Sequence, residues 1–195
     1  MNVKAMNTIK SRANANDRIY TPPQIADLML KFCDYKEGQL VLECCSGNGD
    51  IYEKLKEPKE YCEIDEDRDF FDYCGFVDII ISSPPYSLID YWLKHTYTLC
   101  DKFCYILGVY SLTPKRIEVM NKNDFYITKI LLTKIPNWFQ CSYIIVCERL
   151  QEKPKKIIFD TVNLGNKCLY CGCSVGGTEG YKHCKRKASE TVCRY

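Results

Sequence analysis

The sequence predicts an α/β domain whose centre is an open, mostly parallel sheet with helices on both faces. Short apolar runs of strand length alternate along the chain with segments in which apolar residues recur at helical spacing. The first apolar run leads into a turn that contains Gly47 and Gly49. Open parallel sheets bind ligands at such turns, beyond the carboxyl ends of their strands. Apolar residues make up 46% of the 195 positions, which is enough to bury a core.

The first half of the predicted domain contributes one helix and three strands. Residues 23–33 predict a helix because four apolar side chains recur on one face. Residues 39–43 form a continuous apolar run that ends at the glycine turn, which predicts a buried strand, and residues 60–64 predict a short second strand. Residues 77–82 are rich in isoleucine and stop at two prolines, which cannot donate to a sheet ladder.

The second half adds two helices and three strands. Residues 88–99 and 114–121 have helical periodicity, and proline stands at the start of the second of these segments. Residues 103–109 and 142–147 are apolar runs of strand length. Residues 125–135 alternate between apolar and polar side chains and predict a further strand. Strands and helices thus alternate along most of the chain, as in α/β proteins.

Composition and charge exclude several classes of protein. No run of 18 apolar residues predicts a membrane span, and residues 1–20 lack the apolar core of a secretory signal. The net charge of +2 is too small for a protein that binds nucleic acid by electrostatics alone. With 14 cysteines and no signal, we expect an intracellular protein in a reducing compartment, with thiols or metal ligands rather than disulfides.

Charge and composition divide the chain into four segments. Residues 1–18 and 168–195 each carry a net charge of +3, whereas residues 19–167 between them carry −4. Basic ends suit contact with a polyanion, although solvated tails would have the same composition. We expect a basic tail over 1–18, an α/β domain over 19–149, a polar linker over 150–167 and a cysteine-rich module over 168–195.

The glycine turn and the next strand together suggest a site for a nucleoside. Residues 42–50 read LECCSGNGD, and Gly47 and Gly49 allow a tight turn and close approach of a ligand to the backbone. Glu63 and Asp65 lie at the end of the second strand, where an acidic side chain can hydrogen-bond a ribose diol. The alternatives are an ordinary tight turn and a solvated strand end.

The loop after the third strand suggests a site for a planar amine. Ser83, Pro84, Pro85 and Tyr86 follow that strand directly. Two prolines fix the backbone and remove two donors, so the loop presents carbonyl acceptors, a serine oxygen and an aromatic face. Amine hydrogens can point at the oxygens of Ser83 and Pro84 while Tyr86 stacks on the ring that carries the amine.

These motifs, in this order, resemble the S-adenosylmethionine-dependent amino-methyltransferases that methylate exocyclic amines of bases. The resemblance covers residues 19–149 and implies a Rossmann-like class I methyltransferase fold. Residues 20–23 (YTPP) resemble the N-terminal motif of the family, 43–49 its glycine-rich motif, 69–70 its acidic-aromatic pair and 83–86 its catalytic motif. The cofactor-binding residues that it implies are Tyr20, Thr21, Pro22, Glu43, Cys45, Gly47, Gly49, Glu63, Asp65, Asp69 and Phe70.

The resemblance implies methyl transfer from S-adenosylmethionine to a base in DNA, and we expect adenine N6 as the target. Ser83 stands where adenine enzymes usually carry Asn or Asp, and serine is commoner in enzymes similar to cytosine-N4 methyltransferases. Cytosine N4, adenine in RNA and glutamine N5 in protein therefore stay open, as does a catalytically silent subunit that binds nucleic acid. The few residues between Asp65 and Asp69 imply a sheet with a reduced middle.

The chemistry itself requires positioning rather than a covalent nucleophile. The exocyclic amine is a poor nucleophile, and acceptors at Ser83 and the Pro84 carbonyl would hold its hydrogens and stabilise developing positive charge. Tyr86 is the candidate for stacking on the target base, and Tyr110 and Trp138 are looser candidates for the pocket walls, with ordinary packing as the alternative. No long recognition domain follows, so sequence specificity would need short loops, the C-terminal module, a specificity subunit or a second copy.

The C-terminal module predicts a structural zinc site. A tetrahedral zinc needs four nitrogen or sulfur ligands, and a stretch with so few apolar residues would take folding energy from the metal. Cys173 and His183 are the substitutes for any member of the chosen set, and a loose reduced tail or disulfides are the alternatives. Basic side chains surround the site and could grip phosphates. The chosen ligands are Cys168, Cys171, Cys184 and Cys193.

Overall fold

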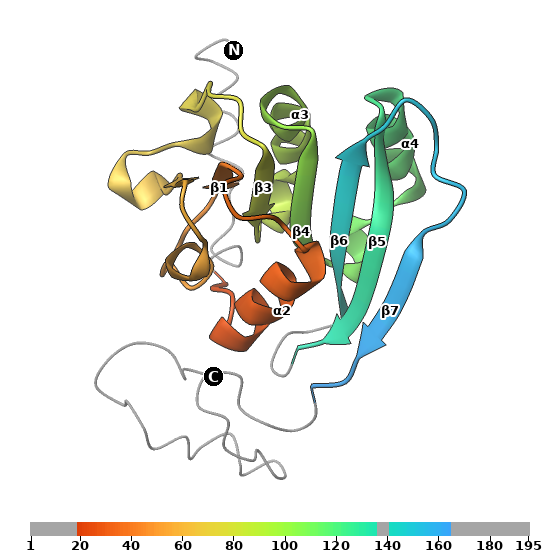
Figure 1. The fold of residues 1–195 in the computed structure, drawn as a ribbon, viewed down its shortest axis with the longest axis horizontal. Coiled ribbons are helices and arrows are strands. Elements are labelled where there is room, and N and C mark those ends of the chain that lie inside the picture. Colours follow the sequence, from red (N-terminus) through yellow and green to blue (C-terminus); the bar gives the residue numbers. More distant parts are fainter. Residues whose placement is uncertain (1–18, 136–140, 165–195) are drawn as a thin grey trace.

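The structure, a computed structural model, describes residues 19–135 and 141–164. Within them lies a seven-stranded sheet in the order β2-β1-β3-β4-β6-β5-β7 (Figure 1). Strands β2, β1, β3 and β4 are mutually parallel, β6 is antiparallel to both of its neighbours, and β7 is parallel to β5. The predicted mostly parallel sheet is therefore confirmed. The strands are β1 (Val41–Glu43), β2 (Lys59–Tyr61), β3 (Ile79–Ser82), β4 (Lys102–Gly108), β5 (Phe125–Lys134), β6 (Cys141–Arg149) and β7 (Ile158–Val162).

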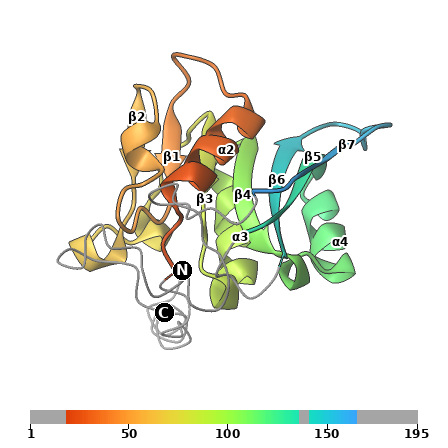
Figure 2. The same ribbon diagram turned by 90° about the horizontal axis from the view of Figure 1, so that it is seen from below.

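Helices cover both faces of the sheet, as predicted. Helix α2 lies on one face, and helices α3 and α4 lie on the other (Figure 2). On the first face Ile25 and Met29 belong to one buried apolar cluster with Ile81 of β3. On the second face Leu93 of α3 belongs to another cluster with Phe103 of β4. Successive strand residues thus face opposite clusters, because side chains alternate across a strand. The helices are α2 (Pro23–Cys33), α3 (Ile89–Leu99) and α4 (Pro114–Lys122).

All the predicted strands and helices are present, with ends displaced by at most three residues. The largest displacement is in β2, which ends at Tyr61 rather than at residue 64. The physical cause is the Glu63 side chain, which accepts a hydrogen bond from the backbone N–H of Asp65 and caps a 3₁₀ turn at Ile64–Glu66. That turn takes the chain out of the sheet before the predicted strand is complete.

The prediction of a linker over 150–167 is corrected by strand β7, which lies within that segment. Residues Ile158–Val162 pair in register with residues 129–133 of β5 and form an edge of the sheet. No sequence pattern indicated this strand because most of its side chains lie in solvent; Ile158 is 57% and Phe159 60% exposed. An edge strand of this kind is fixed by the free backbone groups of its neighbour rather than by its own apolar pattern.

The region between β2 and β3 is reduced, as the resemblance implied. Two 3₁₀ turns, Ile64–Glu66 and Phe70–Asp72, are the helical elements that the structure has there. Within the described residues no further strand lies beyond β2. The side of the sheet that carries β1 and β2 is therefore built largely from loops.

Several predictions fall on residues 1–18, 136–140 and 165–195, which lie outside the described residues. Trp138 is one of them. Within the described residues, no group of three His, Cys, Asp or Glu side chains is placed to hold a metal ion, and no helix is long and apolar enough to cross a membrane. The cysteines predicted to be small core residues are free, and most of them are buried. The proposed zinc ligands Cys168, Cys171, Cys184 and Cys193 also lie outside the described residues.

Candidate active site

The glycine loop after β1 is fixed by hydrogen bonds to the end of β2. The backbone N–H of Cys62 donates to the carbonyl of Glu43 at 2.8 Å, and the N–H of Ser46 donates to the carbonyl of Cys62 at 2.9 Å. Gly47 has a φ of 55° and Gly49 a φ of 82°, a region that L side chains rarely adopt. The loop therefore needs glycine at these two positions, as the sequence suggested.

Glu63 lies against this loop rather than at a free strand end. Its Oε2 accepts a hydrogen bond of 2.6 Å from the N–H of Gly47, and its Oε1 accepts one of 3.2 Å from the N–H of Asp65. The carboxylate thus ties the two predicted cofactor motifs together. Asp65 itself is exposed, at the start of the following turn.

The N-terminal motif packs on the glycine loop at Gly47. A Cβ atom on Gly47 would lie 2.7 Å from Cδ1 of Tyr20, so the absence of a side chain is what admits the Tyr20 ring. Thr21, the next residue, is 7% exposed. Residues 19–21, which are some 25 positions away in the sequence, are therefore part of the same site as the loop.

These segments line a narrow cavity of about 30 Å³. Its lining comes from the N-terminal motif, the glycine loop and the loop after β3. Sequence analysis missed Ile19, Ser46, Asn48, Asp50 and Ile51. For the last four, their position within or directly after the glycine turn was a usable signal. The lining residues are Ile19, Tyr20, Thr21, Glu43, Cys45, Ser46, Gly47, Asn48, Asp50, Ile51 and Ser83.

Glu43 is an unusual group in this lining. It is 2% exposed, and its Oε2 has no hydrogen-bond partner among the described residues. Burial, and to a smaller extent the neighbouring Cys44, raises the pKa of Glu43 to about 9. The side chain is therefore a protonated acid at neutral pH, with an oxygen directed to no protein donor.

Cys45 connects the glycine loop to the predicted catalytic loop. Its Sγ lies 3.0 Å from Oγ of Ser82 and donates to the carbonyl of Ser83, also at 3.0 Å. Hydrogen bonding to Cys44, together with burial, raises the pKa of Cys45, so it stays a thiol that can donate. The two loops that sequence analysis assigned to cofactor and amine are thus in direct contact.

The rest of the catalytic motif is not part of the lining of the narrow cavity. Pro84 is buried, and Pro85 and Tyr86 are half-buried. The Tyr86 ring rests against the end of β4, where a Cβ atom on Gly108 would lie 3.4 Å from its Cε2. Tyr110, which follows in the same loop, is 77% exposed and lies on the surface.

Asp69 and Phe70 lie apart from the cavity lining. Asp69 caps the 3₁₀ turn at Phe70–Asp72, since its Oδ1 accepts from the N–H of Phe71 at 3.1 Å. Phe70 is 2% exposed and stacks on Trp92 of α3 with ring centroids 4.8 Å apart. The contact of this pair with a cofactor adenine stays a prediction.

A buried polar network that no sequence pattern indicated lies beneath the glycine loop. The indole N–H of Trp92 donates to Sγ of Cys44 at 2.9 Å. The hydroxyl of Tyr105 lies 3.6 Å from the same sulfur and 2.7 Å from Oγ1 of Thr96. The network joins the loop to α3 and β4. Buried polar groups whose hydrogen bonds are satisfied favour a single arrangement of the core around them.

Comparison with known proteins shows which solved structures have a similar fold. No family model matches the chain, and no curated protein matches it in sequence. Among solved structures, a candidate RNA methyltransferase from Pyrococcus horikoshii is similar over 65% of this chain and 82% of its own, with 17% identity and a TM-score of 0.54. A candidate class I S-adenosylmethionine-dependent methyltransferase from Listeria monocytogenes matches over 78% of this chain and 68% of its own, with 12% identity and a TM-score of 0.56.

The M protein of the type I restriction enzyme EcoKI is a third neighbour. It matches 80% of this chain and 50% of its own, with 9% identity and a TM-score of 0.52. The chain has the fold of the S-adenosylmethionine-dependent methyltransferases. At these identities the similarity is one of fold, and substrate and activity have to be argued from the site.

Proposed function

We propose that the protein transfers the methyl group of S-adenosylmethionine to the exocyclic amine of a base in DNA, with adenine N6 as the target. The observation that carries the proposal is the cavity shared by the glycine loop and Ser83, the first residue of the predicted catalytic loop. Methyl transfer needs donor and acceptor in line and close together. A cavity lined by both motifs supports that requirement.

The residues of the cavity suit the cofactor. The buried oxygen of Glu43 without a partner can accept a hydrogen bond from an ammonium group, and the cofactor carries one. Gly47 and Gly49 allow a ligand to approach the backbone. Glu63 stands beside the loop as a carboxylate for a ribose diol. When bound, S-adenosylmethionine supplies a methyl group on a positively charged sulfur.

The acceptor side would be formed by Ser83 and Pro84. Ser83 lines the cavity, and its carbonyl already accepts from the Cys45 thiol. In this proposal the Ser83 hydroxyl and the Pro84 carbonyl accept the amine hydrogens, and they would stabilise the positive charge that develops on nitrogen. The Tyr86 ring, held by the end of β4, is the stacking surface for the base.

Similarity to the EcoKI M protein supports DNA as the substrate. RNA adenine is the second candidate, because the neighbour from Pyrococcus horikoshii is described as a candidate RNA methyltransferase and another, from Plasmodium falciparum, as a dimethyladenosine transferase. Cytosine N4, glutamine N5 and a silent subunit are outcomes that the test distinguishes. A specificity subunit or a second copy of the chain is the proposed source of sequence recognition.

The direct test is transfer of a labelled methyl group. The protein is incubated with labelled cofactor and DNA, RNA or protein, and the modified nucleoside or residue is identified after digestion. Ser83→Ala is expected to lower the rate about 10²-fold, the usual cost of one preorganised contact. Tyr86→Ala should abolish transfer and Tyr86→Phe, which keeps the ring, should retain it. Cofactor binding without transfer to any substrate would leave only a scaffold role.

A second test locates the cofactor without relying on activity. Glu43 is protonated at neutral pH because its pKa is about 9, and a cationic ammonium beside it would favour the ionised form. Binding should therefore release about one proton, which calorimetry in buffers of different ionisation enthalpy measures. Glu43→Gln carries no such proton and is the matched control. Equal proton release by both proteins would place the ammonium elsewhere.

We also propose a structural zinc in the C-terminal segment, supported by the cysteine spacing alone. Native mass spectrometry of the full chain should find one zinc, lost in Cys168→Ser and Cys171→Ser. The same thiols imply a reducing compartment. Full metal content in both variants would refute the chosen ligands.

A further inference from the structure

A second cavity lies between helices α3 and α4, and none of its lining residues lines the cavity described above. Its volume is about 410 Å³. The two helices that line it lie on the face of the sheet opposite to α2 (Figure 2). Leu93 and Tyr97 of α3 and Val119 of α4 contribute apolar surface to it. We call this cavity the α3–α4 groove. None of the motifs that predicted the methyltransferase site accounts for it.

An ion pair joins the first turns of the two helices that line the groove. Arg116, in the first turn of α4, donates from Nε to Oδ1 of Asp90 at 2.7 Å and from a terminal nitrogen to Oδ2 at 3.2 Å. The other terminal nitrogen donates to the carbonyl of Ser111 at 2.7 Å. This pairing ties the starts of both helices to the loop that follows β4.

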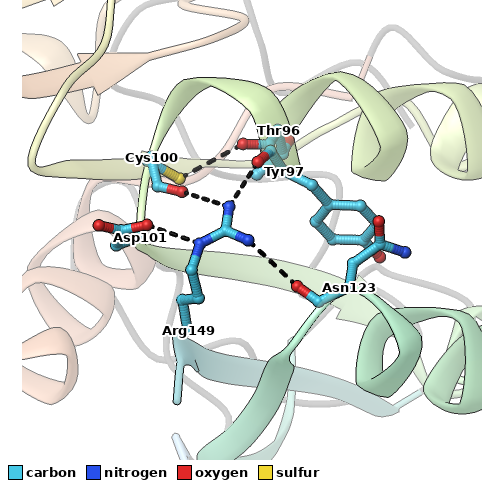
Figure 3. A network of polar contacts seen from close by, with 6 residues as sticks. All are labelled: Thr96, Tyr97, Cys100, Asp101, Asn123 and Arg149. Atoms are coloured by element: carbon cyan, nitrogen blue, oxygen red, sulfur yellow. Dashed lines mark hydrogen bonds and ion pairs between the residues drawn. The ribbon is translucent and has the colours of Figure 1, made fainter. Parts of the chain in front are cut away.

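The opposite end is fixed by Arg149 of β6 (Figure 3). Its guanidinium donates to the carbonyl of Tyr97 at 2.6 Å and to that of Asn123 at 3.2 Å, and it pairs with Asp101 at 2.6 Å. The last turn of α3 and the residue after α4 are thereby joined. Both walls of the groove are therefore held in place without a ligand, which lowers the entropic cost of binding one.

The charge of the groove is positive. Lys94 and Lys115 line it, and neither makes an ion pair within the part of the chain that the structure describes. Asp90 is the acidic side chain among the lining residues, and it forms an ion pair with Arg116. Arg116 first, and then Lys94 and Lys115, lower the pKa of Asp90. Two uncompensated ammonium groups beside an apolar floor suit a phosphate attached to a sugar or base.

The groove also begins where the catalytic loop ends. Helix α3 follows directly from the turn at Tyr86–Leu88, and α4 follows the loop that carries exposed Tyr110. Lys94 lies five residues beyond the start of α3, which is about 7.5 Å along the helix axis. A nucleic-acid strand with one base at Ser83 would therefore pass close to the groove.

We propose that the α3–α4 groove binds a phosphate group of the nucleotide next to the target base, through Lys94 and Lys115, with Tyr110 as a stacking surface for the neighbouring base. The choice of a polynucleotide as the source of the phosphate rests on the proposed function. A free nucleotide offers the same chemistry, and the test separates the two sources.

The test measures the binding of a fluorescent single-stranded oligonucleotide to the full chain across a series of salt concentrations. Each phosphate contact with a single strand contributes about 0.7 to the slope of log K against log salt. Lys94→Gln combined with Lys115→Gln should therefore lower the slope by about 0.7, because the two lysines share one phosphate. Lys122→Gln is the matched control, because Lys122 lies on α4 and pairs with Glu118 outside the groove. Tyr110→Ala should weaken binding about tenfold at fixed salt.

Two readouts keep this proposal separate from the proposed function. Cofactor binding should be unchanged in the double variant, so a loss of slope with intact cofactor binding supports the groove even if no methyl transfer is found. Adenosine monophosphate that competes for the groove in a lysine-dependent way, without oligonucleotide binding there, would assign the phosphate to a free nucleotide. An unchanged slope, or an equal change in Lys122→Gln, together with no lysine-dependent nucleotide binding, would overturn the proposal.

Discussion

The two sides of the sheet are built by different means. The loop half, residues 41–72, has strands of three residues joined by loops and 3₁₀ turns. The strand half, residues 102–149, has strands of seven to ten residues paired along almost their whole length. In the loop half, side chains such as Glu63 and Asp69 bond to nearby backbone groups and fix the local conformation.

The difference separates binding from stability. Most of the cavity lining comes from the loop half, where Gly47 and Gly49 adopt conformations that a regular strand could not provide. The strand half buries a cluster of aromatic rings, among them Phe103 and Phe125. Apolar burial is the main source of folding free energy. Substitutions in the strand half should therefore cost stability, and those in the loop half should cost ligand binding first.

The largest expected effect is in the strand half. Phe103 is fully buried in β4, with the rings of Tyr97, Tyr105 and Phe125 around it. Phe103→Ala should destabilise the protein by about 3–5 kcal/mol, because it removes apolar contacts and leaves a cavity. Urea unfolding measures the loss. A cost below about 1 kcal/mol would mean that this half is not the main source of stability.

The next effect is a pH dependence that originates in the loop half. The pKa of Glu43 is about 9 in the folded protein and near 4.5 when unfolded, so folding takes up a proton between these values. This contribution is fully present below about pH 4.5 and is lost as pH rises toward 9, by about 1.4 kcal/mol per pH unit at most. Glu43→Gln should remove that slope. Thermal unfolding of both proteins from pH 5 to 9 gives the comparison, and parallel curves would contradict it.

Gly47→Ala should separate binding from stability most clearly. The new alanine would have to adopt a positive φ, and its Cβ would lie 2.7 Å from the Tyr20 ring. The loop and the N-terminal motif must therefore move apart. We expect a stability cost of about 1–2 kcal/mol and at least a tenfold loss of cofactor affinity. Gly38→Ala is the control: Gly38 has a φ of 84°, yet no atom lies within 4 Å of its would-be Cβ. Equal loss of cofactor affinity in both variants would refute a specific role for Gly47.

The smallest effect returns to the strand half. The hydroxyl of Tyr97 is buried and has no hydrogen-bond partner within the described residues. Burial raises the pKa of Tyr97 far above its usual range, so the group stays a neutral phenol. Tyr97→Phe should raise stability by up to about 1 kcal/mol, since it removes an unsatisfied polar atom and keeps the ring. Calorimetry that found a loss of stability instead would assign that hydroxyl a partner.

Much of the fold could be predicted because the sequence carries local periodicity. The apolar run before Gly47 and the isoleucines before Ser83 predicted strands and the loops that follow them. The strand Ile158–Val162 could not be predicted in this way, since its side chains lie mostly in solvent and its place depends on the free edge of β5. The predicted end of β2 was wrong because the Glu63 side chain caps the following 3₁₀ turn, and this cap outweighed the β propensity of the residues before it.

The sequence by itself determined which residue types stand at the ends of strands, and thereby where glycine, acid and proline loops occur. Only the tertiary structure decided that Cys45 bonds to Ser82 and Ser83 at the end of β3, that Tyr20 rests on Gly47, and that Glu43 Oε2 is buried without a partner among the described residues. The physical reason is that backbone preference is a local property. Burial and hydrogen bonding between segments far apart in the chain exist only once the sheet has brought those segments together.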